Sequence, residues 1–402
     1  MSTQSAARVC VIRCHYYRDT RLQREVGAML ERGHTVHVLC LRDDGEPAQE
    51  RRDRLTITRI PIKHKPGVGN FRRLAEYAAF FVAISIAVTA MHLRTRLDLV
   101  QVNSVPDALV FAAAVPRLSG ARVLIDLQEP FPEFFASRAG VAADHWAVRF
   151  IARIEQLSIR FAHAAITVTE PMRQAFISRG TPPDKITVVM DGSDAKTFDP
   201  QRLPARERDP DRFVLISHGT IEPHYGLDTA IRAVARLSSA IPSIELRIVG
   251  DGSQRSELQQ LAAGLSVADQ VVFSRGFLAI DELVAELADA DVGVVAMKRN
   301  PFRDLTLAGK MFDFITMGIP MVVSTTQSVE STFPPGCFES FVANDPCDLA
   351  TAIVRLYNDA EAAASYAVRA RNAARPYSWS VQRERYHEVV DALLDGSAAT
   401  KI

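Results

Sequence analysis

Short apolar runs alternate with amphipathic segments along most of the chain. In the first half, the runs that have the length and alternation of strands are residues 9–12, 34–41, 55–62, 97–102, 121–127 and 164–169. Helical spacing of apolar residues separates these runs over residues 22–32, from Asp107, and around residues 146–161. Strands that are separated by helices of this length predict parallel β-α-β units.

The pattern stops over residues 191–212, where Pro, Asp and Arg are frequent and apolar periodicity is lost, so we expect a linker there. Strand-like runs resume at residues 213–216, 244–250, 271–273, 291–297 and 321–325. Helices are expected from Leu227, over residues 257–263, from Asp281 and near Lys310. The predicted fold class is therefore α/β, with two Rossmann-like, doubly wound domains over residues 1–195 and 196–375 that face a cleft.

One long apolar segment leaves three interpretations open. Residues 77–91 contain no charge, and the basic residues on either side are Lys63, Lys65, Arg72, Arg73, Arg94 and Arg96. A helix that is apolar all round is usually buried in a core. A basic-flanked helix of this kind also suits a membrane surface, whereas a bilayer span needs about 20 apolar residues.

Composition narrows the class of protein. The chain has 402 residues, 48% of them hydrophobic, and 47 basic residues balance 47 acidic ones. This balance gives no electrostatic argument for nucleic-acid binding. The first residues lack a basic and an apolar signal region, so we expect a cytoplasmic protein whose five cysteines are reduced and structural.

The stretch "ISHGTIEPHYGLDTAIRAV", residues 216–234, predicts an anion-binding turn. An apolar strand leads into Gly219, a short polar turn ends at Gly226, and an amphipathic helix follows. Backbone N–H groups at Gly219, at Thr220 and near Gly226 suit a phosphate, helped by the positive end of the helix. A glycine-flanked turn of this kind also occurs in α/β proteins without such a ligand, so that alternative remains open.

The turn contains no Lys or Arg, so a bound anion needs cations from elsewhere. The segment "MKRNPFRDLTLAGK" carries Lys298, Arg299, Arg303 and Lys310 after a predicted strand that ends at Met297. Loops that follow parallel strands meet at one edge of a sheet. We therefore expect some of these cations to face the Gly219 turn, the alternative being solvated loop charges.

Several motifs together resemble the family-4 glycosyltransferases, which are retaining enzymes of the GT-B fold. The motifs are "DGSDAKTFDP" from Asp191, "GTIEPHYGLDTAIRAVARL" from Gly219, "LRIVGDGSQRSELQQLA" from Leu246, "VVFSRGFLAIDELVAELADADVGVVA" from Val271, "KMFDFITMGIPMVVS" from Lys310 and "YSW" from Tyr377. The resemblance covers nearly the whole chain. It implies that residues 376–402 form a helix that packs back on the N-terminal domain.

The resemblance also implies the activity. A sugar moves from a UDP- or GDP-linked donor to a glycan or lipid-linked acceptor with retention, in polysaccharide or glycoconjugate biosynthesis. The nucleotide-sugar is a co-substrate, and neither a cofactor nor a metal is expected. A peripheral position on the inner face of the plasma membrane is compatible with such an acceptor. Two alternatives stay open: a catalytically impaired binding or scaffold subunit, and a nucleotide-sugar epimerase.

The family pattern places the donor in the second domain, with departures. Relatives have Arg after the first glycine of the turn and Lys before the second, where this chain has Thr220 and Tyr225. We expect Lys310, with Arg299 or Arg303, to replace their charge. The resemblance assigns catalytic roles to Lys310 and to Asp304, which lies one residue from the position of the family's first carboxylate. It assigns the remaining donor contacts to Asp313 at the ribose and to Asp251, Arg275, Gly276 and Phe277.

In the first domain, "DLQEPFPEFF" from Asp126 resembles the family's D-x-H-E-x-x-P-E turn. Gln128 replaces the usual His and cannot shuttle a proton, but retaining transfer of this kind is thought to use the donor's own phosphate as base. Gln128 and Glu129 are the catalytic candidates here. The candidate acceptor contacts, which follow the strands at 9–12 and 97–102, are Tyr16, Tyr17, Asp19, Arg21 and Asn103.

Overall fold

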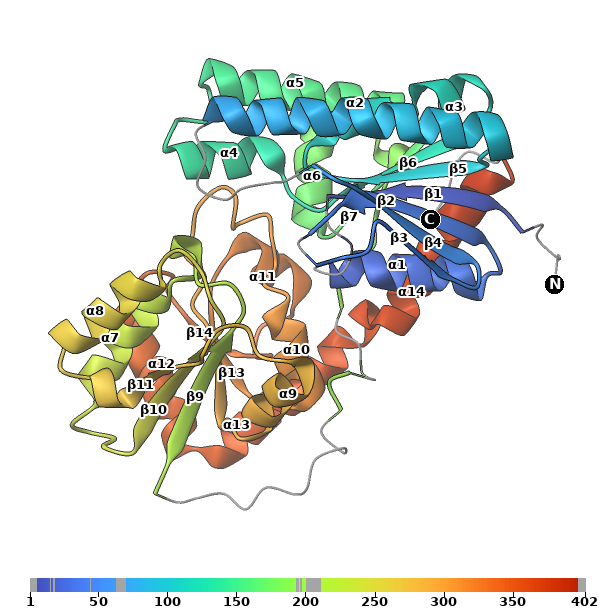
Figure 1. Ribbon diagram of the computed structural model, residues 1–402. Helices are drawn as coiled ribbons and strands as arrows, with labels where there is room; N and C mark the ends of the chain where they lie inside the picture. Colours follow the sequence, from blue (N-terminus) through green and yellow to red (C-terminus); the bar gives the residue numbers. More distant parts are fainter. Residues whose placement is uncertain are drawn as a thin grey trace. The chain divides into compact units, whose positions relative to one another are not determined.

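A computed structural model describes residues 6–14, 16, 19–43, 45–62, 70–192, 195, 197–199 and 211–396, apart from the side chains of residues 70–74. The chain forms two compact units (Figure 1). Unit 1 comprises Met1–Met190 with Gln382–Ile402, and unit 2 comprises Asp191–Val381. Most of the expected linker, including residues 200–210, lies outside the described residues.

Unit 1 is built on an eight-stranded sheet in the order β3-β4-β2-β1-β5-β6-β7-β8. The strands are β1 (Arg8–Ile12), β2 (Thr35–Leu41), β3 (Gln49–Arg52), β4 (Leu55–Ile60), β5 (Leu99–Asn103), β6 (Arg122–Leu127), β7 (Ala164–Thr167) and β8 (Ile186–Val188). All pairs are parallel except β3–β4. The central strands are buried on both faces, which explains their continuous apolar runs.

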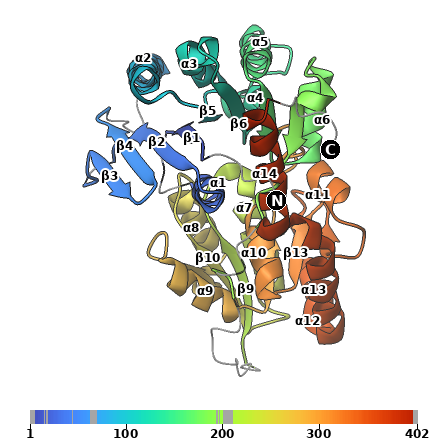
Figure 2. The same ribbon diagram turned by 90° about the vertical axis from the view of Figure 1, so that its right-hand side faces the viewer.

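Helices cover both faces of the unit 1 sheet. Figure 2 shows α2, α3 and α5 in a row on one face, and α1 with α14 on the other. The helices are α1 (Thr20–Glu31), α2 (Asn70–Thr95), η1 (Asp107–Ala113), α3 (Ala114–Leu118), α4 (Phe131–Ala139), α5 (Trp146–Phe161), α6 (Glu170–Ser178), η2 (Pro183–Lys185) and α14 (Trp379–Leu394). Within unit 1, α14 is held by Tyr386, whose hydroxyl donates to Oε1 of Gln101 at 2.6 Å.

Unit 2 has a six-stranded parallel sheet in the order β11-β10-β9-β12-β13-β14. Its strands are β9 (Phe213–His218), β10 (Ile244–Val249), β11 (Val271–Phe273), β12 (Val292–Val295), β13 (Met321–Ser324) and β14 (Glu339–Phe341). The helices are η4 (Pro223–Tyr225), α7 (Leu227–Leu237), α8 (Arg255–Gly264), η5 (Ala268–Gln270), α9 (Ile280–Ala288), α10 (Lys310–Met317), α11 (Gln327–Thr332), α12 (Pro346–Asn358), α13 (Ala360–Ala374) and η6 (Arg375–Tyr377).

The α/β fold with two parallel sheets is confirmed, and each strand expected from the apolar runs is present. Three strands were not expected: β3, β8 and β14. The sequence of β3 is QERR, and as an antiparallel edge strand it is mostly exposed. Such a strand lacks the apolar alternation by which strands are found. The two others have only three residues each.

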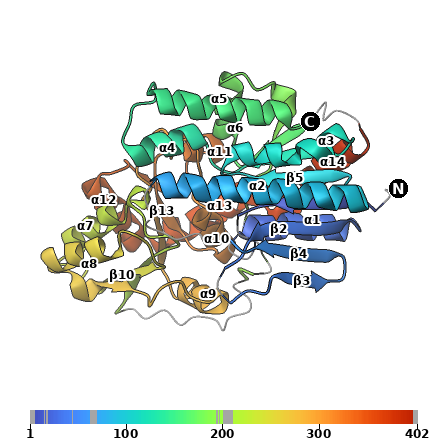
Figure 3. The same cartoon turned by 45° about the horizontal axis from the view of Figure 1, so that its top comes forward.

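The long apolar segment belongs to α2, which is longer than residues 77–91 (Figure 3). Its window Ala75–Thr95 has a mean hydropathy of 1.6, enough in length and composition to cross a membrane, and only 22% of that window is buried. A core helix is mostly buried. The interpretation of this segment as a buried core helix therefore holds for one stripe only.

Candidate active site

In unit 2, the strand order reverses between β9 and β12, and ligands of such sheets bind beyond the carboxyl ends of the strands at this reversal. The turn after β9 begins at Gly219, whose φ is +110°, and ends at Gly226, whose φ is +64°. A Cβ on Gly226 would lie 1.9 Å from the carbonyl oxygen of Ala296, just after β12. Only glycine allows this close approach, which brings the turn against the end of β12.

Lys310, the first residue of α10, reaches this turn. Its Nζ donates to Oγ of Ser217 at 3.3 Å and lies 4.6 Å from the ring centroid of Tyr225. A Cβ built on Gly219 would be 4.0 Å from the same nitrogen. Burial, and secondarily the charge of Arg303, lower the pKa of Lys310 to about 7. The positive charge of the Lys310 ammonium is thus poorly compensated by its surroundings, and an anion at the turn would stabilise the charged form.

Arg303 is the second cation at the same ring. Its Cζ lies 4.9 Å from the centroid of Tyr225, and the side chain is buried. It donates to Oγ1 of Thr306 at 3.2 Å, while its buried Nε has no acceptor among the described residues. Two of the expected cations therefore meet beside the Gly219 turn, at the ring of Tyr225.

The other two cations are engaged elsewhere. Lys298 forms an ion pair with Asp228 at 2.9 Å. Arg299 is exposed, and its Nε lies 3.2 Å from Oδ1 of Asp304. The same oxygen accepts the backbone N–H of Gln327 at 3.1 Å. Asp304, proposed as a substitute for a catalytic carboxylate, thus has a structural explanation in capping α11 and pairing with Arg299.

Asp313 lies on α10 one turn after Lys310, and its Oδ2 is 3.5 Å from Nε2 of His218. Burial, with Lys310 as the second cause, lowers the pKa of His218 to about 3, so the imidazole is neutral. Ser217 and His218 were both missed in the sequence analysis. Their position in the sequence could have revealed them, because they are the last two residues of β9 before Gly219.

The backbone donors differ from expectation at two positions. One is Gly226, whose N–H donates to the carbonyl oxygen of Pro223 at 3.4 Å, and the other is Gly219. The N–H of Gly219 donates to the carbonyl oxygen of Val249 at 2.8 Å, which joins the ends of β9 and β10. It is therefore engaged within the sheet, and the expectation that it binds an anion needs correction. Thr220 is exposed, and its N–H makes no backbone hydrogen bond within the part of the chain that the structure describes.

The ends of β10 and β11 form the rest of this edge. Asp251 accepts the N–H of Gly252 at 2.9 Å and is exposed. Gly276 has a φ of +141°, and its carbonyl oxygen accepts the hydroxyl of Ser274 at 2.6 Å. Phe277 is 66% exposed, which leaves its ring accessible for stacking. The neighbouring Arg275 pairs with Glu282 on α9.

In unit 1, a buried polar network joins α1 to the carboxyl ends of β5 and β6. Arg21 donates through Nε and Nη2 to both carboxylate oxygens of Asp126, each at 3.0 Å. It also lies 3.1 Å from Glu25 and donates to the carbonyl oxygen of Val189 at 2.8 Å. Asn103 donates to Asp126 at 2.7 Å. Burial, and next the charge of Asp126, raise the pKa of Glu25 to about 8.

This network orients Gln128. Its Nε2 donates to Asp126 at 2.8 Å, and its Oε1 accepts from Nη2 of Arg13 at 2.9 Å. Arg13 is held in turn by Asp19, 2.8 Å from its Nε. Both ends of the Gln128 amide are thereby fixed in direction. Glu129 follows Gln128 and is half-buried.

The candidate acceptor residues are placed differently from expectation. Arg21 and Asn103 are buried, with their polar groups used inside the network, so they have no surface to offer a ligand. Tyr16 is also buried, and Asp19 caps α1 by accepting the N–H of Leu22 at 2.9 Å. Tyr17 lies outside the described residues. Alternation of strands and helices cannot show which way a side chain at the end of a strand points.

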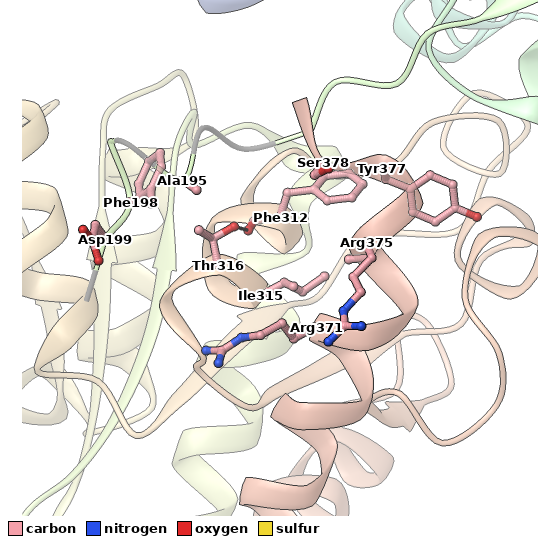
Figure 4. A pocket seen from close by; sticks show the side chains of 11 residues that line it. Ala195, Phe198, Asp199, Phe312, Ile315, Thr316, Arg371, Arg375, Tyr377 and Ser378 are labelled. Atoms are coloured by element: carbon pink, nitrogen blue, oxygen red, sulfur yellow. Dashed lines mark hydrogen bonds between the residues drawn. The ribbon is translucent and has the colours of Figure 1, made fainter. Parts of the chain in front are cut away.

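A pocket of about 360 Å³ lies elsewhere in unit 2 (Figure 4). Phe312, Ile315 and Thr316 line it from α10, opposite Arg371 and Arg375. On a helix these three positions face away from Lys310 and Asp313. The pocket is therefore separated from the Gly219 turn by α10 itself.

Two family models match the chain in order along the sequence. The model described as "Glycosyl transferase 4-like domain" matches residues 19–192, and the one described as "Glycosyl transferases group 1" matches residues 212–359. The first match therefore covers unit 1 from residue 19 to Met190 and extends two residues into unit 2, and the second lies within unit 2.

Relatives and solved structures agree with these models. A GDP-mannose-dependent α-(1-6)-phosphatidylinositol monomannoside mannosyltransferase of Mycolicibacterium smegmatis is 29% identical over 67% of this chain and 75% of its own length. A D-inositol 3-phosphate glycosyltransferase of Stackebrandtia nassauensis is 31% identical over 49% and 46%. Sucrose-phosphate synthase of Thermosynechococcus elongatus superposes with a TM-score of 0.78 at 18% identity, covering 97% of this chain and 100% of its own.

Proposed function

The chain belongs to the group 1, family-4 glycosyltransferases and has their GT-B fold, and we propose that it transfers a hexosyl group from GDP-mannose or a UDP-sugar to a lipid-linked glycan acceptor, with retention. The observation that carries the donor assignment is Lys310 beside the Gly219 turn, with Arg303 on the same tyrosine ring. The turn follows β9, where the strand order of the sheet reverses. A nucleotide diphosphate gains negative charge as it departs, and cations at this turn would stabilise it.

The donor would lie along the carboxyl edge of the unit 2 sheet. We place the diphosphate at Thr220 and at the first turn of α7, where N–H groups of the helix point outward. Lys310 would bind the oxygens that gain negative charge as the sugar leaves. Asp313 would accept from the ribose hydroxyls, and the exposed ring of Phe277 would stack on the base.

Gln128 is compatible with a retaining transfer that uses no protein base. Because its amide is fixed between Asp126 and Arg13, it offers one remaining N–H and one lone pair in a defined direction. These suit a hydroxyl group of a sugar bound at unit 1. Since an amide does not take up a proton at neutral pH, the acceptor proton would pass to the leaving phosphate.

The acceptor proposal rests on the relatives. The Mycolicibacterium relative is named for mannose transfer to a phosphatidylinositol monomannoside, which is a glycolipid. The Stackebrandtia relative is instead named for D-inositol 3-phosphate, which carries no lipid, so the glycolipid proposal rests on the Mycolicibacterium relative. We propose a glycolipid acceptor for this chain, in glycoconjugate or polysaccharide biosynthesis.

A transfer assay tests this function. The purified chain is incubated with labelled GDP-mannose or UDP-glucose and a total lipid extract, and labelled glycolipid is separated by chromatography. We expect transfer with one donor and none with Lys310→Ala, while Lys298→Ala retains activity. If GDP and UDP both fail to raise the melting temperature at millimolar concentration, the donor proposal is wrong. Nucleotide binding without transfer or donor hydrolysis would instead support the catalytically impaired binding subunit.

Nucleotide binding should weaken as the pH rises above about 7. The pKa of free Lys310 is about 7, and a bound diphosphate raises it. Binding above that pH therefore takes up a proton, and the affinity falls by at most about tenfold per pH unit. Titration calorimetry at pH values between about 7 and 9, in two buffers of different ionisation enthalpy, measures both quantities. A constant affinity without proton uptake would contradict the prediction.

The stability contribution of Lys310 has the opposite pH dependence. Its folded pKa of about 7 is below the ordinary value of 10.5. Between these two values the unfolded chain binds more protons than the folded one, so the free energy of unfolding gains from Lys310 as the pH rises. Lys310→Met should remove the contribution of Lys310 to the pH dependence of nucleotide affinity and to that of the free energy of unfolding. Any pH dependence that remains in the variant belongs to other titrating groups.

A further inference from the structure

The described part of unit 1 exposes its large apolar side chains on one helical layer. They are Val82, Ile86 and Leu93 on α2, Val115 and Leu118 on α3, and Trp146, Phe150 and Leu157 on α5. Leu118 is 84% exposed and Trp146 is 73% exposed. We call these eight residues the outer apolar face. Apolar residues gathered in this way mark an interaction surface, whereas scattered ones need no explanation.

On α2, two stripes of the helix have different surroundings. Phe80, Ile84, Val88 and His92 follow one another at intervals of four residues and are buried, so this stripe packs against unit 1. Residues 82, 86 and 93 lie on the outward stripe. Residues 77–93 include no charged residue on that stripe. A surface helix of a globular protein normally has polar residues there.

On α5, the outward stripe mixes apolar and basic residues. Trp146, Phe150 and Leu157 repeat the spacing of the three exposed α2 residues. Arg149, Arg153 and Arg160 are exposed beside them, and their side chains form no ion pair within the described residues. The only carboxylate of α5 is Glu155, which is buried and held by Arg179 at 2.8 Å. The stripe is therefore cationic as well as apolar.

The three helices form one continuous layer. α2 contacts α3 and η1, and η1 also contacts α5. Figures 2 and 3 show α2, α3 and α5 lying side by side on the same face of the unit 1 sheet. The outer apolar face thus spans the width of the layer and is bordered by the arginines of α5.

We propose that the outer apolar face docks unit 1 on the surface of an anionic lipid bilayer, with α2 and α5 lying in the plane of the interface. Apolar side chains would enter the boundary between headgroups and acyl chains, and the free arginines would bind lipid phosphates. Trp146 suits this boundary, where indole rings gather. The inference goes beyond the proposed function, because neither the donor nor the acceptor enters it.

Two features favour a lipid surface over a membrane-spanning α2 and over a second copy of the chain. A spanning α2 would have to leave the domain, yet its Phe80, Ile84 and Val88 are packed inside it. A second copy seated face to face would bring the unpaired arginines of both copies into a desolvated contact, which is costly for like charges. Anionic lipid instead adds about 1 kcal/mol for each Lys or Arg near the surface.

Vesicle flotation tests the proposal on the full chain without donor or acceptor. We expect the protein to float with vesicles of phosphatidylcholine and phosphatidylglycerol, and much less with phosphatidylcholine alone. The double variant Ile86→Glu with Phe150→Glu should lower the partition coefficient by about tenfold or more. Arg149→Gln with Arg153→Gln should lower it only for the anionic vesicles. The control is Val342→Glu with Val368→Glu, two exposed residues of unit 2, which should float like the wild type.

Fluorescence gives a second readout. The chain has two tryptophans, Trp146 and Trp379, so Trp379→Phe leaves Trp146 as the reporter. Its emission should shift to shorter wavelength on anionic vesicles.

Absence of flotation with both vesicle types overturns the proposal, as does flotation that the unit 1 variants leave unchanged. A doubled molar mass in solution that Ile86→Glu with Phe150→Glu abolishes would assign the face to a second copy instead. Unchanged circular dichroism and an unchanged melting temperature of these variants show that they fold, and because neither measurement uses a nucleotide, the outcome is independent of the transfer assay.

Discussion

Lys310→Ala is expected to weaken binding of GDP or UDP by roughly 30- to 150-fold, which corresponds to about 2–3 kcal/mol for a lost hydrogen bond to a charged group. The reason is geometric, because Lys310 is the cation that lies 4.0 Å from the Cβ position of Gly219. Titration calorimetry with the diphosphate and with the corresponding nucleoside separates the two parts of the ligand. The nucleoside should be affected much less, since it carries no phosphate.

Lys298→Ala is the matched control for this prediction. Lys298 belongs to the same basic segment, but its ammonium is engaged with Asp228 at 2.9 Å. We expect its replacement to change diphosphate affinity by less than about threefold, as for other surface ion pairs. Equal weakening of nucleoside and diphosphate by Lys310→Ala would exclude a phosphate contact and indicate a general distortion of the turn.

Arg21→Met is expected to lower the free energy of unfolding by about 3–5 kcal/mol, because it removes one partner of a buried charge network. Arg21, Glu25 and Asp126 are all buried, and Arg21 is the cation that both carboxylates contact. Its removal leaves Asp126 with only neutral donors from Asn103 and Gln128. Chemical denaturation followed by circular dichroism measures the loss.

Arg138→Met is the control, because Arg138 is an exposed arginine of the same unit and should change stability by less than about 0.5 kcal/mol. Adding Asp126→Asn to Arg21→Met should recover part of the loss, since the buried negative charge then also disappears. A cost below about 1 kcal/mol for Arg21→Met would mean that the network is not as buried as described. It would also reopen the assignment of Arg21 to an acceptor.

The alternation of apolar runs was sufficient for the fold class and for most elements. Parallel strands buried on both faces are continuous in their hydrophobicity, so their sequences are recognisable one by one. β3 was missed because an exposed edge strand has no such signature. The glycines of the 219–226 turn were recognised as well. Both have a positive φ, which disfavours other residues, and a Cβ on Gly226 would also meet the carbonyl oxygen of Ala296.

The candidate site was only partly predictable. The cluster that includes Lys310 and Arg303 was located because loops after parallel strands meet at one edge of a sheet. Which of its four cations point at the turn was not predictable. Lys298 forms an ion pair with Asp228 and Arg299 forms one with Asp304. Lys310 and Arg303 instead lie over the ring of Tyr225. These choices depend on side-chain directions that spacing along the chain does not contain.

By itself, the sequence determined the two α/β sheets, the glycine turn and the resemblance to a family of sugar-transferring enzymes. The tertiary structure decided where charge and apolar surface lie. Arg21 and Asn103 point into unit 1 and donate to Asp126, which also accepts from the Gln128 amide and so orients it. The tertiary structure also left one stripe of α2 exposed. Periodicity describes each element alone, whereas burial depends on what packs against it.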